Sequence, residues 1–217
     1  MVLRPICEPV ELPLGTSVIA ERVRIDAEAP DVGRFLHFHD VAELVLFRRV
    51  RGTFIADGRQ HRLDDGAIVF VPSMHRHDFA LERGAMEWVL VQVDPYIVEA
   101  LALRTNVPRL SCAFCAAMDE RTRLRIDCLA DWLLEATKRA SPTVERIVEL
   151  LLLTAAEAPM GESAAQAENP AQVERLLPAL ERLRMSPAEP IALETAATLC
   201  RLSPAYFSRR FRHWSCW

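Results

Sequence analysis

The stretch HFHDVAELVLFRRV, residues 37–50, joins two histidines and a glutamate to a run of aliphatic and aromatic residues. Side chains two positions apart on a β-strand face the same way, so His37 and His39 are expected to point into one space. Glu43 follows a short turn and begins the next strand. The stretch therefore predicts a strand–turn–strand unit that gathers two imidazoles and a carboxylate, all of them groups that can bind a metal ion.

Further short strands are predicted on both sides of this unit, up to about residue 94. Aliphatic and aromatic residues recur in the segments 17–25, 34–38, 43–50, 53–56, 67–72, 77–82 and 86–94. The pairs Asp57-Gly58, Asp65-Gly66 and Arg83-Gly84 are turn signals between them. Short strands at this spacing are typical of an antiparallel sandwich or barrel. We therefore predict an α+β chain in which residues 1–94 form an antiparallel β-barrel.

Residues 95–158 have a helical pattern. Apolar residues at helical spacing predict one stripe, formed by Leu129, Trp132, Leu133 and Ala136. The segment 144–153 is apolar nearly all round, which predicts a buried helix. Packing on the barrel and packing on a partner subunit in a homodimer are both open alternatives for this helical segment. The CAFC motif at 112–115 is interpreted as two partly buried thiols in a loop, because no second C-x-x-C follows it.

Residues 159–171 are small, polar and proline-containing, and this composition predicts an interdomain linker. The last segment, 172–217, is predicted to be all-α. In it, IALETAATLC and SPAYFSRRFRHW indicate two short helices joined by a tight turn. Ser203 suits the position that caps a helix, and Pro204 suits the first helical position.

The second of these helices separates an apolar face from a polar one. Phe207 and Phe211, four residues apart, are expected to face inward. The outer face would carry Ala205, Ser208, Arg209 and Arg212. Residues 182–217 contain six arginines and two glutamates, a net charge of +4 in a chain whose net charge is −4. This pattern fits a recognition helix in a DNA major groove, and it also fits a helical hairpin with a solvated basic face.

Composition excludes several classes of protein. No stretch of the 217 residues approaches the roughly 20 apolar residues of a membrane-spanning helix. The first residues show no signal peptide, and the six cysteines are scattered rather than arranged as a disulfide framework. We therefore expect a cytoplasmic protein with reduced thiols and no membrane partner.

The segment PIALETAATLCRLSPAYFSRRFR, residues 190–212, resembles the first helix-turn-helix of the AraC family of transcription regulators. The resemblance implies that Ala205, Ser208 and Arg209 face DNA bases and that Arg212 reaches a phosphate. The family's DNA-binding unit has two such motifs. We therefore expect a partial DNA-binding domain, truncated after its first motif, whose binding to DNA alone would be weakened or lost.

The strand-rich region resembles the cupin barrel that serves as the sensor domain in many regulators of that family. His37, His39 and Glu43 fit its first motif, H-x-H-x(3,4)-E. Gly66, Pro72 and His77 fit its second motif, in which Met74 stands in the place of a glycine. The resemblance covers about residues 34–94. It implies that the ligands of a divalent metal ion, which could be Zn, Ni, Fe or Mn, are His37, His39, Glu43 and His77.

His75 could replace His77 as a ligand or support it from behind, and it could equally be an exposed loop residue; His61 is expected to be structural or exposed. Three readings of the predicted quartet are open: a metal site, a pocket for a small organic effector, and a purely structural cluster. Together, the two resemblances imply a homodimeric DNA-binding regulator that senses a metal ion or small molecule, and no enzymatic activity. The alternatives are a cupin metalloenzyme, of the dioxygenase or isomerase type, and a truncated regulator that no longer binds DNA.

Overall fold

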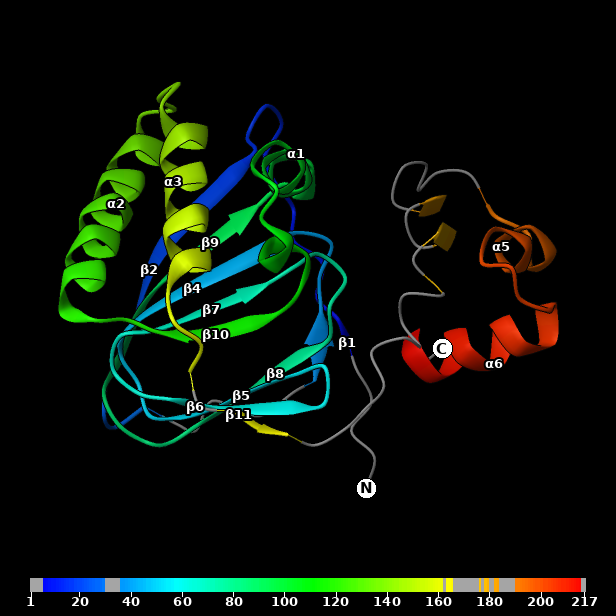
Figure 1. Cartoon of the computed structure of the whole chain (residues 1–217), viewed down its shortest axis with the longest axis horizontal. Coiled ribbons are helices and arrows are strands. Elements are labelled where there is room, and N and C mark those ends of the chain that lie inside the picture. Colours follow the sequence, from blue (N-terminus) through cyan, green and yellow to red (C-terminus); the bar gives the residue numbers. More distant parts are fainter. Residues whose placement is uncertain are drawn as a thin grey trace.

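Two β-sheets packed face to face form the larger part of the molecule (Figure 1). The computed structural model describes residues 6–29, 36–161, 163–165, 176, 178–179, 182–183 and 190–215. The first sheet has the strand order β1-β3-β8-β5-β6-β11 and the second the order β10-β7-β4-β9-β2. The strands are β1 (Ile6–Cys7), β2 (Val18–Ile25), β3 (His37–Phe38), β4 (Ala42–Arg49), β5 (Gly52–Ala56), β6 (Arg59–Leu63), β7 (Ala67–Val71), β8 (His77–Leu81), β9 (Met86–Val93), β10 (Phe114–Ala117) and β11 (Ser163–Ala165). Apart from the parallel pair β1 and β3, neighbouring strands are antiparallel, so the antiparallel barrel-like fold is confirmed.

Alternation along the strands divides the apolar side chains between two cores. On β4, Val45 and Phe47 face the space between the sheets, whereas Leu44 and Leu46 belong to the core on the other face. This is the period-2 pattern expected of a sheet that is covered on both sides. Strand β4 therefore contributes side chains to both hydrophobic cores. By the same alternation, the side chain of Glu43 lies on the face of Val45, toward the space between the sheets.

Helices cover the outer face of the five-stranded sheet (Figure 1). They are α1 (Pro95–Thr105), the 3-10 helix η1 (Pro108–Ser111), α2 (Glu120–Lys138) and α3 (Val144–Glu157). Ile126 and Leu133 of α2 and Leu151 of α3 are buried in the shared core. Packing on the barrel, one of the two predicted alternatives, is thus observed. A role of these helices in a dimer stays a prediction.

The predicted apolar stripe of α2 is confirmed for Leu133 and Ala136, which are buried, and for Leu129, which packs against the same core, but it is wrong for Trp132. Trp132 is 51% exposed, whereas Ile126, Ala130, Leu133 and Ala136 are buried. The α2 helix is rotated about its axis so that its buried aliphatic side chains pack against α3 and the sheet. The indole of Trp132 is therefore left partly in solvent. On α3, Leu150 is 50% exposed, so that helix keeps an open apolar side.

Strands also form outside residues 1–94. The CAFC motif lies only partly in a loop, because Cys115 belongs to β10, which begins at Phe114 and pairs with β7, whereas Cys112 precedes the strand. Within the predicted linker, β11 pairs with β6, and Met160 forms an isolated bridge with Ala116. Residues 166–171 of that segment lie outside the described residues. In the predicted strand 34–38, the structure assigns only His37–Phe38, and residues 34–35 are not among the described ones.

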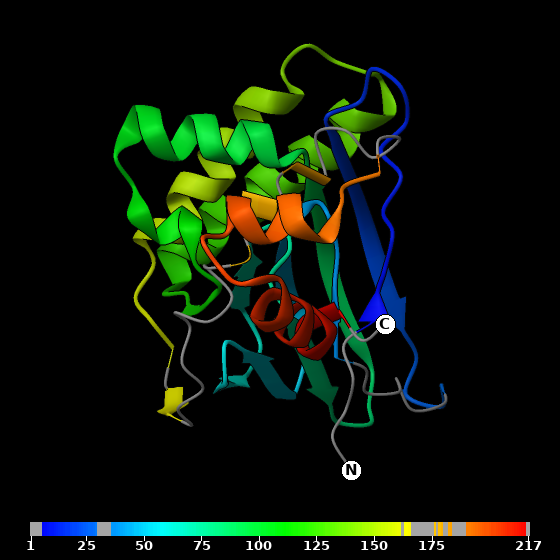
Figure 2. The same ribbon diagram turned by 90° about the vertical axis from the view of Figure 1, so that its right-hand side faces the viewer.

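The end of the chain contains two helices joined by a turn. These are α5 (Leu193–Leu199) and α6 (Pro204–Ser215), and Arg201 in the turn has a φ of 52°. The hydroxyl of Ser203 accepts a hydrogen bond from the backbone N–H of Tyr206, as a helix cap does. We call the described residues from Leu176 onward the C-terminal unit; its helices α5 and α6 lie to one side of the barrel in Figure 1 and in front of it in Figure 2. Among the described residues, no helix has the length and apolar character needed to cross a membrane.

Candidate metal centre

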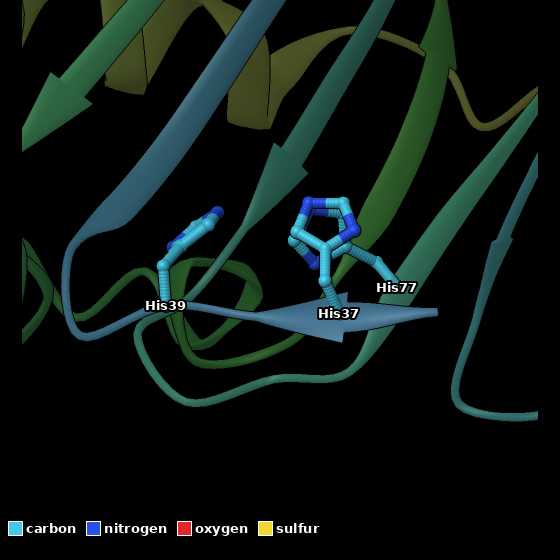
Figure 3. A group of neighbouring side chains, drawn as sticks. All are labelled: His37, His39 and His77. Carbon is cyan, nitrogen blue, oxygen red and sulfur yellow. The ribbon is translucent and has the colours of Figure 1, made fainter. Parts of the chain in front are cut away.

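Strands β3 and β8 bring three histidines together inside the barrel. His37 is in register with His77, and their ring centroids are 4.0 Å apart. His39 lies two residues beyond His37, and its ring centroid is 5.0 Å from that of His77. The potential ligand atoms of the three side chains all lie within 4.8 Å of one another (Figure 3). We call these three residues the histidine cluster.

Backbone carbonyls fix the orientation of two of the rings. The Nδ1 of His39 is 2.8 Å from the carbonyl oxygen of Val41, and the Nδ1 of His77 is 3.1 Å from that of His75. A carbonyl only accepts, so each Nδ1 carries the proton in the neutral ring. Each Nε2 then holds a lone pair that can bind a metal ion, the arrangement usual for ligating histidines.

Glu43 stands next to two members of the cluster. Its Oε2 lies 3.2 Å from Nε2 of His39, and its Oε1 lies 3.7 Å from Nε2 of His77. Burial would raise the pKa of Glu43, but hydrogen bonds from the Nε2 atoms of His39 and His77, together with the charge of these rings when they are protonated, outweigh this effect and hold the pKa well below its usual range. Glu43 is therefore a carboxylate, available as an oxygen ligand or as a counter-charge.

Two buried imidazole nitrogen atoms of the cluster indicate whether these residues could bind a metal ion. The Nε2 atoms of His39 and His77 are buried, and neither makes a hydrogen bond of regular geometry with a described residue. Leaving such an atom unsatisfied costs about 1–3 kcal/mol. A divalent ion would satisfy both atoms at once, and three imidazoles with a carboxylate suit Zn, Ni, Fe or Mn. The site therefore fits the predicted class of ligand.

The structure brings three of the four predicted ligands within mutual reach. Glu43 is close to His39 and His77 but is not in the group of mutually close ligand atoms. The ring of His75 points elsewhere, with its Nδ1 3.6 Å from Asp57, and His75 supports the cluster through its carbonyl group. That these residues bind a metal stays a prediction.

One neighbour of the histidine cluster was not predicted from the sequence. Glu8, directly after β1, has an oxygen 3.5 Å from Nε2 of His37. His61, which was expected to be either structural or exposed, is buried, with its ring centroid 5.8 Å from that of Phe54. Burial is the main reason that the pKa of His61 is lowered, and the charge of Arg59 adds to it. The parallel pairing of a two-residue strand leaves no local pattern, so Glu8 had no signal in the sequence.

The predicted DNA-contacting residues lie on α6. Ala205 is exposed and Ser208 is partly exposed. The backbone of Arg209 and Arg212 is helical, and their side chains are outside the described part of the structure. The helix and its cap are therefore observed, while contact with DNA stays a prediction.

The chain is similar to one protein family and to several solved structures. The family model described as "AraC-like ligand binding domain" matches residues 20–180. An apo variant of ToxT from Vibrio cholerae is similar at 6% identity with a TM-score of 0.54, covering 91% of this chain and 75% of its own. Unsaturated fatty acid bound ToxT from the same organism has 6% identity and a TM-score of 0.52, covering 92% and 74%.

The AraC-like transcriptional activator CuxR is similar at 14% identity with a TM-score of 0.48, over 80% of this chain and 61% of its own. The chain thus spans about three fifths of CuxR and three quarters of ToxT. At these identities the ToxT likeness shows the fold alone. No curated protein sequence matches the chain.

Proposed function

The chain belongs to the family of AraC-like ligand-binding domains, and we propose that it is a transcription regulator whose barrel senses a divalent metal ion. The observation that carries the proposal is the histidine cluster, because three imidazoles with mutually close ligand atoms lie buried next to a carboxylate. In this proposal His37, His39 and His77 hold the ion, and Glu43 is its fourth ligand or its counter-charge. The ion would supply a positive charge that links β3, β8 and β4.

DNA binding is assigned to α6. The support is the capped helix after a tight turn, the arginine-rich composition of residues 201–212 and the resemblance of this segment to a helix-turn-helix. A recognition helix reads bases from its N-terminal part, where Ala205 is exposed. Arg209 is the side chain best suited to bidentate contact with guanine, and Arg212 to a phosphate.

A homodimer is proposed through α2 and α3. Both helices expose large apolar side chains on their outer surface, namely Leu124 and Trp132 on α2 and Leu150 on α3. Exposed apolar groups on neighbouring helices favour association with a second copy. In such a dimer, metal binding would shift the population between two placements of the DNA-binding helices.

Elemental analysis of the full chain, purified without chelators, tests the metal. We expect about one equivalent of a divalent metal in the wild type and a loss in His39→Ala, because this removes a member of the cluster. His75→Ala is the matched control, since its ring lies outside the cluster. Mobility shift with the protein's own promoter, with and without the metal, then tests regulation. Metal-free protein that binds no added Zn²⁺ or Co²⁺ would contradict the sensing proposal.

A small organic effector is the second candidate. Aromatic rings line the barrel beyond the histidines, with Phe54 5.2 Å from Phe79 and Phe47 5.9 Å from Trp88. One ToxT structure is described as bound to an unsaturated fatty acid. A thermal-shift series with Zn²⁺ in one arm and unsaturated fatty acids in the other separates the two candidates. Stabilisation by the acids alone would favour the organic effector.

A further inference from the structure

Two carboxylates approach the histidine cluster, and they differ in burial. The side chain of Glu43 is 8% exposed and contacts His39 and His77. The side chain of Glu8 is 52% exposed, and its Oε2 lies 3.5 Å from Nε2 of His37. Glu43 is therefore on the buried side of the cluster, and Glu8 is on the side that faces solvent.

The backbone of Glu8 is fixed beside strand β3. Strand β1 runs parallel to β3, with Cys7 level with Phe38. The backbone N–H of Glu8 donates a hydrogen bond of 2.9 Å to the carbonyl oxygen of Phe38. Pro9 follows directly, and a proline restricts the residue before it to extended backbone conformations. Glu8 is thus held next to the cluster by its own backbone.

Alternation along these two strands decides which side chains face the cluster. Phe38 points away from the histidines, into a hydrophobic core that it shares with the C-terminal unit. Cys7 is level with Phe38 and is exposed, so it lies on the same side as Phe38. Glu8 is one residue further along and faces the histidines. Strand β1 therefore offers the cluster a carboxylate rather than a thiol.

The separation of 3.5 Å between Oε2 of Glu8 and Nε2 of His37 suits two ligands of one ion. It is longer than a regular N–H···O hydrogen bond, which measures about 2.7–3.2 Å. Zinc and similar ions lie about 2.0–2.2 Å from nitrogen and oxygen ligands, so neighbouring ligand atoms on one ion are about 3–3.5 Å apart. Oε2 of Glu43 and Nε2 of His39, 3.2 Å apart, have a separation in the same range.

The charge of a bound ion gives an independent reason for a second carboxylate. The three histidines are buried, and neutral imidazoles leave both positive charges of a divalent ion uncompensated. Glu43 cancels one of these charges. A net charge in a buried site costs free energy unless it is paired. The carboxylate of Glu8 would cancel the second charge and make the occupied site neutral.

We propose that Glu8 is a fifth ligand of the ion in the histidine cluster, and that it favours ions that take more than four ligands. This inference rests on the proposed metal binding. Three histidines and Glu43 already complete the four-ligand set usual for structural Zn²⁺. A further carboxylate therefore adds more to the binding of Mn²⁺ or Fe²⁺.

A change of rotamer would bring Glu8 to the ion. In the metal-free structure Glu8 lies outside the group of mutually close ligand atoms, as Glu43 does. Exposed side chains change rotamer within nanoseconds, and Glu8 is half exposed. The required movement is therefore small and does not involve the backbone, which its hydrogen bond to Phe38 holds in place.

The test uses the full chain with Co²⁺, whose visible absorption spectrum depends on the atoms bound directly to the ion. We expect Glu8→Ala to change this spectrum and to lower the affinity for Co²⁺ by about tenfold, the lower end of the range for groups that support a metal site. Added acetate should restore the wild-type spectrum, because it supplies a carboxylate to the vacated position. Glu11→Gln, which removes a charge from an exposed position on the same segment, is the control and should match the wild type.

Competition between ions tests the preference. Glu8→Ala should raise the ratio of Zn²⁺ affinity to Mn²⁺ affinity, whereas an equal loss for both ions would contradict the preference. Glu8→Asp keeps the charge on a shorter side chain and should retain part of the Co²⁺ affinity. A wild-type Co²⁺ spectrum in Glu8→Ala would overturn the role of Glu8 as a ligand and leave the histidine site standing. Absence of Co²⁺ binding in the wild type would overturn both.

Discussion

Glu43 places one carboxylate oxygen 3.2 Å from Nε2 of His39 and the other 3.7 Å from Nε2 of His77. A single carboxylate thereby links β4 to the two short segments that carry the histidines. In the metal-free protein it stabilises the buried imidazoles. With an ion present, the same oxygens are placed to share its charge.

Replacing this carboxylate should weaken metal binding more than it weakens the fold. We expect Glu43→Gln to lower the affinity for Co²⁺ by roughly 10–100-fold, the range seen when groups that orient or support ligands are removed. Titration followed by visible absorption measures the change. Glu8→Gln is the comparison, because Glu8 is half exposed and contacts only His37 of the cluster. A larger loss in Glu8→Gln than in Glu43→Gln would contradict this assignment.

The stabilisation by metal should depend on pH. Burial lowers the pKa of His39, but the Glu43 carboxylate outweighs it and raises the pKa above the ordinary value of 6.5. Protonated His39 then stabilises the metal-free protein fully below pH 6.5, and this stabilisation is lost as the pH rises through the raised pKa. A metal ion binds the neutral ring, so its apparent affinity rises over the same interval.

We therefore expect the increase in Tm caused by Zn²⁺ to grow from about pH 6 to about pH 8. Thermal unfolding with and without the ion measures it. In Glu43→Gln the growth should begin at lower pH, because the group that raises the pKa of His39 is gone. An increase in Tm that is the same at every pH would disprove the role of His39.

The two cysteines of the C-x-x-C motif should react very differently with alkylating reagents. Cys112 is exposed, whereas Cys115 is buried. Burial raises the pKa of the Cys115 thiol to about 12, so the reactive thiolate is scarce near neutral pH. Mass spectrometry after treatment with iodoacetamide should find Cys112 modified, together with the exposed Cys128, and Cys115 modified only in denaturant. Equal labelling of Cys112 and Cys115 in the folded protein would contradict the buried position.

Arg109 should contribute to stability through the end of α3. Its Nη1 donates hydrogen bonds to the carbonyl oxygens of Ala156 and Ala158, and its guanidinium carbon lies 4.3 Å from the centre of the Phe114 ring. We expect Arg109→Ala to lower the free energy of unfolding by about 1.5–3 kcal/mol, the range for hydrogen bonds to a charged group. Chemical denaturation measures this change. Arg104→Ala, which breaks a surface ion pair with Glu149, should cost less than about 1 kcal/mol.

The strands with strong alternation could be predicted to within about a residue. The sequence predicted a strand over 43–50, and β4 spans Ala42–Arg49. Strands β10 and β11 were not predicted, because each is short and depends on a distant partner: Phe114 pairs with Phe70, and Ser163 with His61. The local sequence of a short segment does not indicate which distant strand it will pair with. The prediction that Trp132 faces the core was wrong for a related reason. Helical periodicity shows which residues share a face of the helix, but it does not fix how the helix is rotated about its axis against the sheet.

The candidate site, too, could be predicted only in part. Alternation alone placed His37 and His39 on one face of a strand, and resemblance to a known motif added Glu43 and His77. The carbonyl groups that orient the rings come from backbone geometry, which side-chain identity does not reveal. Nor did the pattern at 37–43 reveal that Phe38 would be buried by residues more than 130 positions away.

The order of strands in the six-stranded sheet bears on how easily the C-terminal unit can be released. Strand β11 forms one edge of this sheet, and β3, which carries Phe38, lies next to the opposite edge. The chain thus holds the unit by a covalent tether at one side and by a reversible contact at the other. Short tethers give effective concentrations on the order of millimolar, independent of how much protein is present. A contact that would be too weak to hold two separate molecules together can therefore hold these two parts of one chain together.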